Sequence, residues 1–280
     1  MSNAEQVEYW NGKVGETWVG MQKRMDRTLT PVTAALLSLA APQPGEHVLD
    51  IGCGAGETTL ALAAAVGDDG LAIGIDISEP LLARARQRAE ELLSEADFRN
   101  VDATTFNDEA DSFDLIVSRF GVMFFADPTA AFANLYRVAH PGARLCFACW
   151  QSPSENLWAT LPTQLLADVL PPDPRYDPNA PGPFAFADPE HVAAILGDAG
   201  WQAPVFHAMP FAMVMGEGDD PVAAAVDFAL RIGPAARSVR EAGPEVVAIA
   251  RERLAKAFAD HLAEGQVGLP AAIWLVTADA

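Results

Sequence analysis

Three glycines lie between an apolar run and an apolar helical pattern in the stretch VLDIGCGAGETTLALA, residues 48–63. Gly52, Gly54 and Gly56 are spaced as G-x-G-x-G, which differs from the G-x-G-x-x-G of dinucleotide-binding loops. Glycine has no Cβ atom and adopts positive φ at little cost, so its backbone can approach a ligand closely. The helix that follows offers unpaired amides and a partial positive charge. This stretch predicts either a ligand-binding loop between a strand and a helix or an ordinary tight turn.

Short β-branched or aromatic runs alternate with helix-patterned segments from residue 47 to residue 150. This alternation predicts a parallel sheet with helices on both faces, an α/β fold. The expected strands are 47–51, 71–76, 97–102, 113–118 and 143–150, and the expected helices between them are 58–66, 80–95 and 128–139.

The remainder of the chain predicts additions to that core. Residues 1–41 combine an aromatic patch with the amphipathic pattern of Leu29, Val32, Leu36 and Leu39, which favours a helical cover over the sheet edge. Residues 42–280 would form the main domain. Within it, 152–189 is rich in proline and favours a loop or an extended crossing, and 220–264 has a helical pattern interrupted at two Gly-Pro pairs. A helix is expected at 189–201, and strands are expected at 203–215 and 269–278.

Charge and cysteine content exclude several classes of protein. Lys and Arg total 18 against 38 Asp and Glu, a net charge of -20, which repels nucleic acid and anionic membranes. Cys53, Cys146 and Cys149 lie in apolar segments, so neither a disulfide framework nor a metal site is expected. No apolar run approaches the length of a membrane span, and the N-terminus lacks the pattern of a secretory leader. We therefore expect a soluble, cytoplasmic protein.

Polar residues end several of the predicted strands. Asp50, Asp76, Asp102 and Ser118 would meet at the carboxyl edge of the sheet, where open α/β sheets bind ligands. Asp50, just before the glycine loop, favours a ligand with cationic or donor groups. Asp76 can accept both hydroxyls of a ribose, and Asp102 can accept from an adenine amino group. The alternative for Asp76 and Asp102 is that they only cap strand ends.

These acids and this loop resemble the class I S-adenosylmethionine-dependent methyltransferases, and the resemblance spans residues 47–150. It implies a doubly wound, seven-stranded sheet, mostly parallel with one antiparallel strand, with 205–215 and 271–277 as the last two strands. It also implies S-adenosylmethionine as the cofactor, with the loop around its methionine part, Asp76 at its ribose and 101–103 along its adenine. The cofactor-binding residues expected are Asp50, Gly52, Cys53, Gly54, Gly56, Asp76, Ile77, Asp102, Ala103 and Ser118.

The resemblance implies transfer of a methyl group from a sulfonium to a nucleophile. A sulfonium is an excellent leaving group, so alignment of donor and acceptor in a dry pocket can supply most of the catalysis. A general base is therefore optional, and we assign no catalytic residue. The acceptor expected is a small, mostly apolar metabolite, methylated at oxygen, carbon or nitrogen. The arrangement is loosely similar to the ubiquinone and menaquinone biosynthesis methyltransferases.

The acceptor cavity has several candidate residues, each with an alternative role. Trp10 and Trp18 either pack within the N-terminal helices or form a lid that excludes water. Arg119 either pairs with a nearby carboxylate or holds an acidic group of the substrate. Met123, Phe124 and Trp150 line the cavity or belong to the core, and His207 could act as a base.

Two rival functions share this fold. In one, the bound cofactor is only a scaffold for a reaction without methyl transfer, such as a cyclisation. In the other, the chain is a non-catalytic partner of another methyltransferase. The acidic surface and the aromatic residues argue against tRNA or DNA as the acceptor, and the sequence leaves the oligomeric state open.

Overall fold

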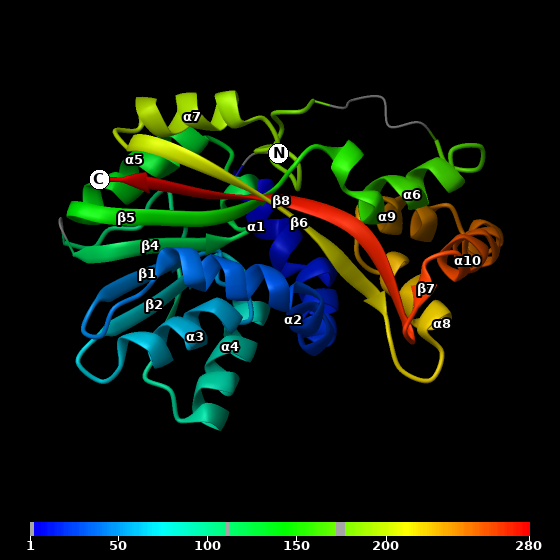
Figure 1. Ribbon diagram of the computed structural model, residues 1–280, viewed down its shortest axis with the longest axis horizontal. Helices are drawn as coiled ribbons and strands as arrows, with labels where there is room; N and C mark the ends of the chain where they lie inside the picture. The colour runs from blue at the N-terminus through cyan, green and yellow to red at the C-terminus, as the bar shows by residue number, and fades with distance from the viewer. Residues whose placement is uncertain (1–2, 110–111, 172–176) are drawn as a thin grey trace. The chain divides into compact units, whose positions relative to one another are not determined.

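A central sheet of eight strands organises the computed structural model, which describes residues 3–109, 112–171 and 177–280 (Figure 1). The strand order is β3-β2-β1-β4-β5-β8-β6, with the short β7 paired to β8. The strands are β1 His47–Ile51, β2 Leu71–Asp76, β3 Asp97–Asn100, β4 Phe113–Arg119, β5 Ala139–Trp150, β6 Gln202–Gly216, β7 Leu262–Ala263 and β8 Gln266–Asp279.

Five of these strands run parallel, and one long strand runs against them. β1 pairs in parallel with β2 and β4, β2 with β3, and β4 with β5. The amide of Ala280 donates to Ala143, and the amide of Gln151 donates to Ala272, so β8 descends as β5 ascends. The predicted mostly parallel sheet of seven long strands with one antiparallel member is confirmed, and β7 adds a short eighth strand.

Two groups of helices cover the parallel part of the sheet. α3 Glu57–Val66 and α4 Glu79–Leu92 follow β1 and β2, and both contact α2 Lys13–Ala40. α5 Pro128–Val138 contacts α7 Pro189–Asp198 on the opposite side of the sheet (Figure 1). This places β1, β2 and β4 between helices, with their carboxyl ends open to the loops that follow them.

The N-terminal segment forms α1 Asn3–Asn11 and the long α2. Met21, Met25, Leu29, Val32 and Leu36 recur at helical spacing and are buried, because they pack against α4, β4 and β5. The amphipathic pattern thus predicts the face by which α2 is held to the sheet.

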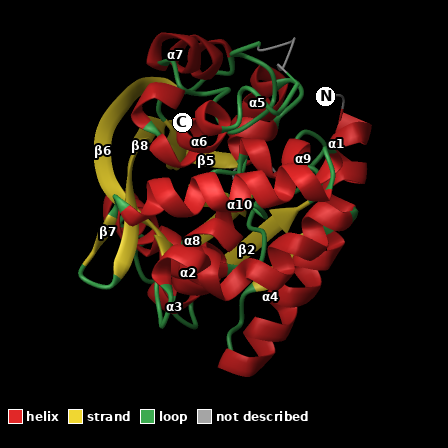
Figure 2. Ribbon diagram, turned by 90° about the vertical axis from the view of Figure 1, so that its right-hand side faces the viewer, coloured by secondary structure: helices red, strands yellow, loops and turns green. Residues whose placement is uncertain are grey.

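The chain forms two compact units. Unit 1 contains the described residues of 1–150, 179–208 and 274–280, and unit 2 contains those of 151–178 and 209–273. Unit 2 is largely helical: α8 Pro221–Ala229, α9 Pro234–Glu241 and α10 Pro244–Ala259 form the segment predicted at 220–264, and α10 contacts both α8 and α6 Leu157–Leu165 (Figure 2). All candidate site residues belong to unit 1.

The structure differs from the sequence-based expectation in three elements. Residues 157–165, expected in a loop, form α6, because the prolines of 152–189 are concentrated after this helix and only Pro162 lies inside it. β5 begins at Ala139 rather than residue 143, with a register shift opposite Phe113 and Leu115. β3 ends at Asn100, so Asp102 lies in the loop that follows. Within the proline-rich segment predicted at 152–189, residues 172–176 lie outside the described ranges.

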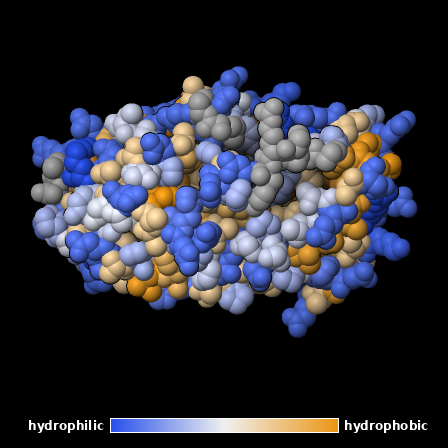
Figure 3. Space-filling view, turned by 90° about the horizontal axis from the view of Figure 1, so that it is seen from above, coloured by the Kyte–Doolittle hydropathy of each residue, from blue (hydrophilic) through white to orange (hydrophobic). Residues whose placement is uncertain are grey.

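The surface mixes polar and apolar residues. On the face seen in Figure 3 the hydrophobic residues form small groups among hydrophilic ones. Within the described ranges, no helix has the length and apolar character needed to span a membrane. The same residues contain no cluster of three or more histidine, cysteine or acidic side chains arranged to hold a metal ion.

Candidate cofactor and active site

The glycine loop turns sharply between β1 and α3. The amides of Gly52 and Cys53 both donate to the carbonyl of Ile75, at 2.9 and 3.1 Å, which holds the loop against the end of β2. Gly52 has φ of +64°, and a Cβ atom there would lie 2.7 Å from the Cα of Gly121. Gly54 has φ of +54° and nothing within 4 Å of its Cβ position. The loop is therefore closely packed at Gly52 and open at Gly54.

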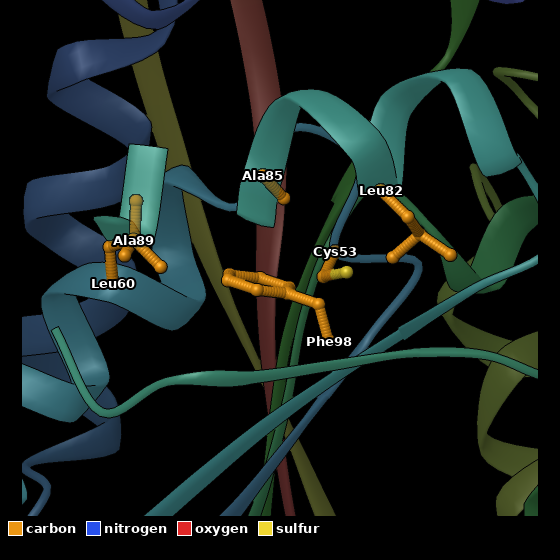
Figure 4. Packing of buried hydrophobic residues seen from close by; sticks show 6 residues of the cluster. All are labelled: Cys53, Leu60, Leu82, Ala85, Ala89 and Phe98. Atoms are coloured by element: carbon orange, nitrogen blue, oxygen red, sulfur yellow. The ribbon is translucent and has the colours of Figure 1, made fainter. Parts of the chain in front are cut away.

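A small apolar cluster supports the loop from beneath (Figure 4). Its members are Cys53, Leu60, Leu82, Ala85, Ala89 and Phe98. A Cβ atom at Gly56 would lie 2.7 Å from the Phe98 ring, so glycine is required there by space as well as by its φ of +83°. Burial raises the pKa of the Cys53 thiol well above its usual range, with further contributions from Asp76 and Asp50. The thiol packs in this core, so Cys53 can face a ligand only through its backbone.

Asp50 is a buried carboxylate with one unpaired oxygen. Its side chain is 1% exposed, and Oδ2 accepts a 2.6 Å hydrogen bond from the Thr59 hydroxyl. Oδ1 has no partner among the described residues. Burial raises the pKa of Asp50 to about 7, against the opposing effects of Thr59 and Arg119. A cationic or donor group placed beside Oδ1 would stabilise the ionised form.

Asp76 ties the glycine loop to the start of α4. Oδ2 accepts from the Gly54 amide and Oδ1 from the Ser78 amide, each at 2.8 Å. Burial raises the pKa of Asp76, and these amides oppose the rise. Each carboxylate oxygen has a second lone pair. Asp76 can therefore accept ribose hydroxyls while it keeps its two backbone partners.

Asp102 and Ala103 lie beyond β3 and already have polar partners. Oδ1 of Asp102 accepts from the amide and the hydroxyl of Thr104, both at 2.8 Å, and Oδ2 accepts from the Asn3 side chain. The Ala103 carbonyl accepts a 2.8 Å hydrogen bond from Asn134. An adenine amino group would share Asp102 with Asn3.

Ser118 joins the ends of two strands rather than facing open space. Its hydroxyl donates to the carbonyl of Ile51 at 2.8 Å and accepts from the Gly121 amide at 3.1 Å, and the residue is fully buried. This side chain sets the approach of Gly121 to Gly52. A ligand contact at this position would come from the backbone.

α1 is bound to the ends of β2 and β3. The Asn11 amide group donates to the carbonyl of Ile77 at 2.8 Å, and its oxygen accepts from the Glu79 amide at 3.0 Å. The Ser78 hydroxyl donates to the carbonyl of Trp10 at 2.8 Å. No local sequence pattern marks Asn3, Asn11 or Ser78 as a site residue, because each acts through a contact with a segment far along the chain.

Three of the predicted cavity residues come together. The Trp10 ring lies 5.7 Å from Trp18 and 5.5 Å from Phe124, centroid to centroid, both edge to face. Met123 is 1% exposed, and its carbonyl accepts from the Gly182 amide. Thus Trp10, Trp18 and Phe124 form one aromatic group between α1, α2 and the end of β4.

Two other predicted cavity residues lie on β5 and β6. Trp150 is buried and stacks on Phe120 with centroids 4.5 Å apart, and Phe120 has an unusual φ of +69°. His207 is exposed on β6, at the end of the strand order, with β5 and β8 between it and β4. The structure does not bring His207 to the glycine loop.

Arg119 pairs with α2. Its guanidinium donates to the Thr33 hydroxyl at 2.7 Å and lies 3.7 Å from Asp26. Asp26 is also 3.2 Å from Arg88, which in turn binds Glu57 and donates to the carbonyl of Ala55 at 2.7 Å. Of the two alternatives for Arg119, the structure has the carboxylate pair. We call Asp26, Glu57, Arg88 and Arg119 the α2 ion cluster.

Comparisons with known proteins agree with this geometry. Residues 48–142 match the family model described as a methyltransferase domain. A demethylmenaquinone methyltransferase of Corynebacterium kroppenstedtii is 28% identical over 206 residues, covering 68% of this chain and 86% of its own. Two other curated relatives align over only 51% and 60% of their own length.

Solved structures share the fold at low sequence identity. A putative methyltransferase of Bacillus halodurans superposes with a TM-score of 0.59 at 17% identity, covering 88% of this chain and 97% of its own. The [4+2]-cyclase SpnF superposes with a TM-score of 0.52 at 17% identity, covering 89% and 80%. The fold is thus shared by proteins named for different reactions. The matched domain over residues 48–142, the sheet order and the glycine loop all agree with the class I S-adenosylmethionine-dependent methyltransferases, which this chain resembles.

Proposed function

We propose that this chain transfers a methyl group from S-adenosylmethionine to a small, mostly apolar acceptor. The observation that carries the proposal is the buried Asp50 carboxylate, with one oxygen unpaired beside a glycine loop whose Gly54 side is open. An unpaired buried carboxylate oxygen is costly unless a ligand provides a donor or a cation.

The hydrogen-bonding groups around Asp50 fit the cofactor. Oδ1 of Asp50, which lacks a partner among the described residues, suits the positively charged methionine part, and the amides of the first turn of α3 suit polar groups. Asp76 retains lone pairs for ribose hydroxyls, and Asp102 offers a carboxylate for adenine. The roles of Gly52, Gly54, Gly56, Ile77, Ala103 and Ser118 are proposed as backbone contributions to this site.

The residues of this chain would bind and orient the cofactor and the acceptor, and they would exclude water from the reacting atoms. The bound cofactor supplies an activated methyl group on a good leaving group. Asp50 would hold its methionine part and Asp76 its ribose, while Trp10, Trp18 and Phe124 would shield the reacting atoms from water. We assign no general base, because alignment is sufficient for such a transfer.

A small apolar acceptor is favoured by the aromatic group and by the relatives. One relative is named as a demethylmenaquinone methyltransferase, and demethylmenaquinone is a mostly apolar molecule. The net charge of -20 argues against nucleic acid as the acceptor.

We further propose that residues 1–41 act as a cover for a domain formed by residues 42–280. We also propose that the protein is cytoplasmic, where its three buried free thiols would stay reduced.

Mass spectrometry of candidate acceptors tests the proposal. The protein is incubated with S-adenosylmethionine and a panel of phenols and reduced quinones, and the gain of one methyl group is sought together with S-adenosylhomocysteine release. Asp50→Asn should abolish most of the gain, while Asp97→Asn, an exposed acid on β3, should not. Acceptor turnover without S-adenosylhomocysteine release would favour the scaffold alternative, and no binding of either cofactor form would favour the non-catalytic partner.

A further inference from the structure

Gln6 is a buried amide without a hydrogen-bond partner. The residue is 1% exposed, although its neighbours Glu5 and Val7 on α1 are exposed. Neither Nε2 nor Oε1 has a partner among the described residues. Because buried amides are almost always paired in folded proteins, an amide with both atoms unpaired requires an explanation.

The face of α1 that carries Gln6 lies over the carboxyl ends of the strands. Asn3, Gln6 and Trp10 are spaced by three and four residues, so they share one face of the helix. At one end of this face Asn3 donates to Asp102, and at the other the Trp10 carbonyl accepts from Ser78, two residues after Asp76. Gln6 therefore lies between the contacts that α1 makes near Asp102 and near Asp76.

The unpaired buried groups are concentrated in one part of the fold. Within the described ranges, the buried side-chain atoms that lack a partner are the two of the Gln6 amide and Oδ1 of Asp50. Asp50 is the next-to-last residue of β1, and Gln6 is on the helix bound near the ends of β2 and β3. This distribution is typical of groups that a ligand satisfies.

We propose that Gln6 is a cofactor-binding residue whose amide pairs with the adenine of S-adenosylmethionine. The inference rests on the proposed function and extends it to α1. A primary amide presents a donor beside an acceptor, which matches the amino group and adjacent ring nitrogen of adenine. Asp102 already accepts three hydrogen bonds, so a second residue that recognises the base complements it.

Calorimetric titration with S-adenosylhomocysteine and with its deaminated analogue, in which inosine replaces adenosine, tests the pairing. For the parent compound, Gln6→Leu should weaken binding by about tenfold, the loss of one or two hydrogen bonds in a buried site. Deamination should cost the native protein more affinity than it costs Gln6→Leu. Glu8→Gln, an exposed change on the same helix, is the matched control and should leave both affinities unchanged.

A second readout separates a binding residue from a structural one. Gln6→Leu removes an unpaired buried amide, so the ligand-free variant should melt at the same temperature as the native protein or higher. A lower melting temperature with unchanged affinity would overturn the inference, as would equal costs of deamination in the two proteins. If the native protein binds neither compound, the proposed function itself fails; if it binds the parent and Gln6→Leu binds equally well, only the inference fails.

Discussion

Asp50 and Asp26 are carboxylates of the same unit, but they differ in how far neighbouring groups pair their negative charge. Burial raises the pKa of both. Asp26 is surrounded by Arg88, Arg119 and a hydrogen bond from Gln22, whereas Asp50 has only the Thr59 hydroxyl and an unpaired oxygen. The α2 ion cluster is satisfied within the protein, and the glycine-loop site is not.

A charged group that stabilises the fold can therefore be distinguished from one that binds a ligand. A paired buried carboxylate contributes to the attachment of α2, so its removal should cost stability. An unpaired one costs stability in the ligand-free protein and gains its partner on binding. Substitutions in the two regions should therefore have opposite effects on folding and on affinity.

The largest expected effect is on stability. Asp26→Ala takes the carboxylate partner from Arg119 and leaves Arg88 with Glu57, both in mostly buried positions, which should lower the free energy of unfolding by about 3 kcal/mol. Urea denaturation measures the loss. Asp227→Ala, which breaks an exposed pair with Arg231 on α8, should cost under about 1 kcal/mol. Equal losses in the two variants would mean that the α2 ion cluster is not structural.

The next effect is on cofactor affinity. Asp76→Ala removes the acceptor proposed for the ribose hydroxyls and the partner of the Gly54 amide, so binding of S-adenosylhomocysteine should weaken at least tenfold, about 1.5–3 kcal/mol. Calorimetry measures it. The control is Asp97→Ala, which removes an acid from the first position of the neighbouring strand β3. Unchanged affinity in Asp76→Ala would contradict the ribose assignment.

Asp50→Asn should lower cofactor affinity without lowering the stability of the ligand-free protein. The neutral amide no longer stabilises a cationic group, so affinity should fall about tenfold. Stability of the ligand-free variant at pH 8 should equal or exceed that of the native protein, because a desolvated charge is removed. A less stable Asp50→Asn with native affinity would reverse the contrast with Asp26.

The pH dependence is a smaller effect with a defined sign. The folded pKa of Asp50 is raised from 3.8 to about 7, so the folded state keeps a proton that the unfolded state loses. The contribution of Asp50 to stability is therefore greatest below about pH 4 and declines as pH rises to about 7. Ligand affinity should change the other way, falling about fivefold from pH 7 to pH 6 as the carboxylate protonates. Both slopes should become shallower in Asp50→Asn, while Asp76 and Asp26, whose pKa values are also raised, keep a remainder of the stability slope. Slopes equal to those of the native protein would assign them to other groups.

The sequence predicted the parts of this site that depend on local pattern. The alternation of strands and helices placed Asp50 and Asp76 at strand ends, and glycine spacing located a loop whose positive φ angles the structure has. Trp10, Trp18 and Phe124 were chosen as aromatic residues near that edge, and they are in contact.

Other parts depend on tertiary contacts that no local pattern reveals. The Ser118 hydroxyl connects two strand ends, and Arg119 meets Asp26 across 93 positions of the chain. Asp26 is partly buried on a helix whose sequence pattern indicates only an apolar face. A glutamine near the N-terminus is expected to be solvated, so the sequence does not indicate Gln6 as a site residue. Its significance appears only when its burial and its missing partners are known.

A crystal structure of the protein with S-adenosylhomocysteine tests the central claim most directly. We expect the compound over the carboxyl ends of β1 and β2, with its homocysteine amine beside Oδ1 of Asp50, its ribose on Asp76 and its base beside Asp102 and Gln6. Density for the compound elsewhere, or a saturated crystal with nothing at these residues, would contradict it.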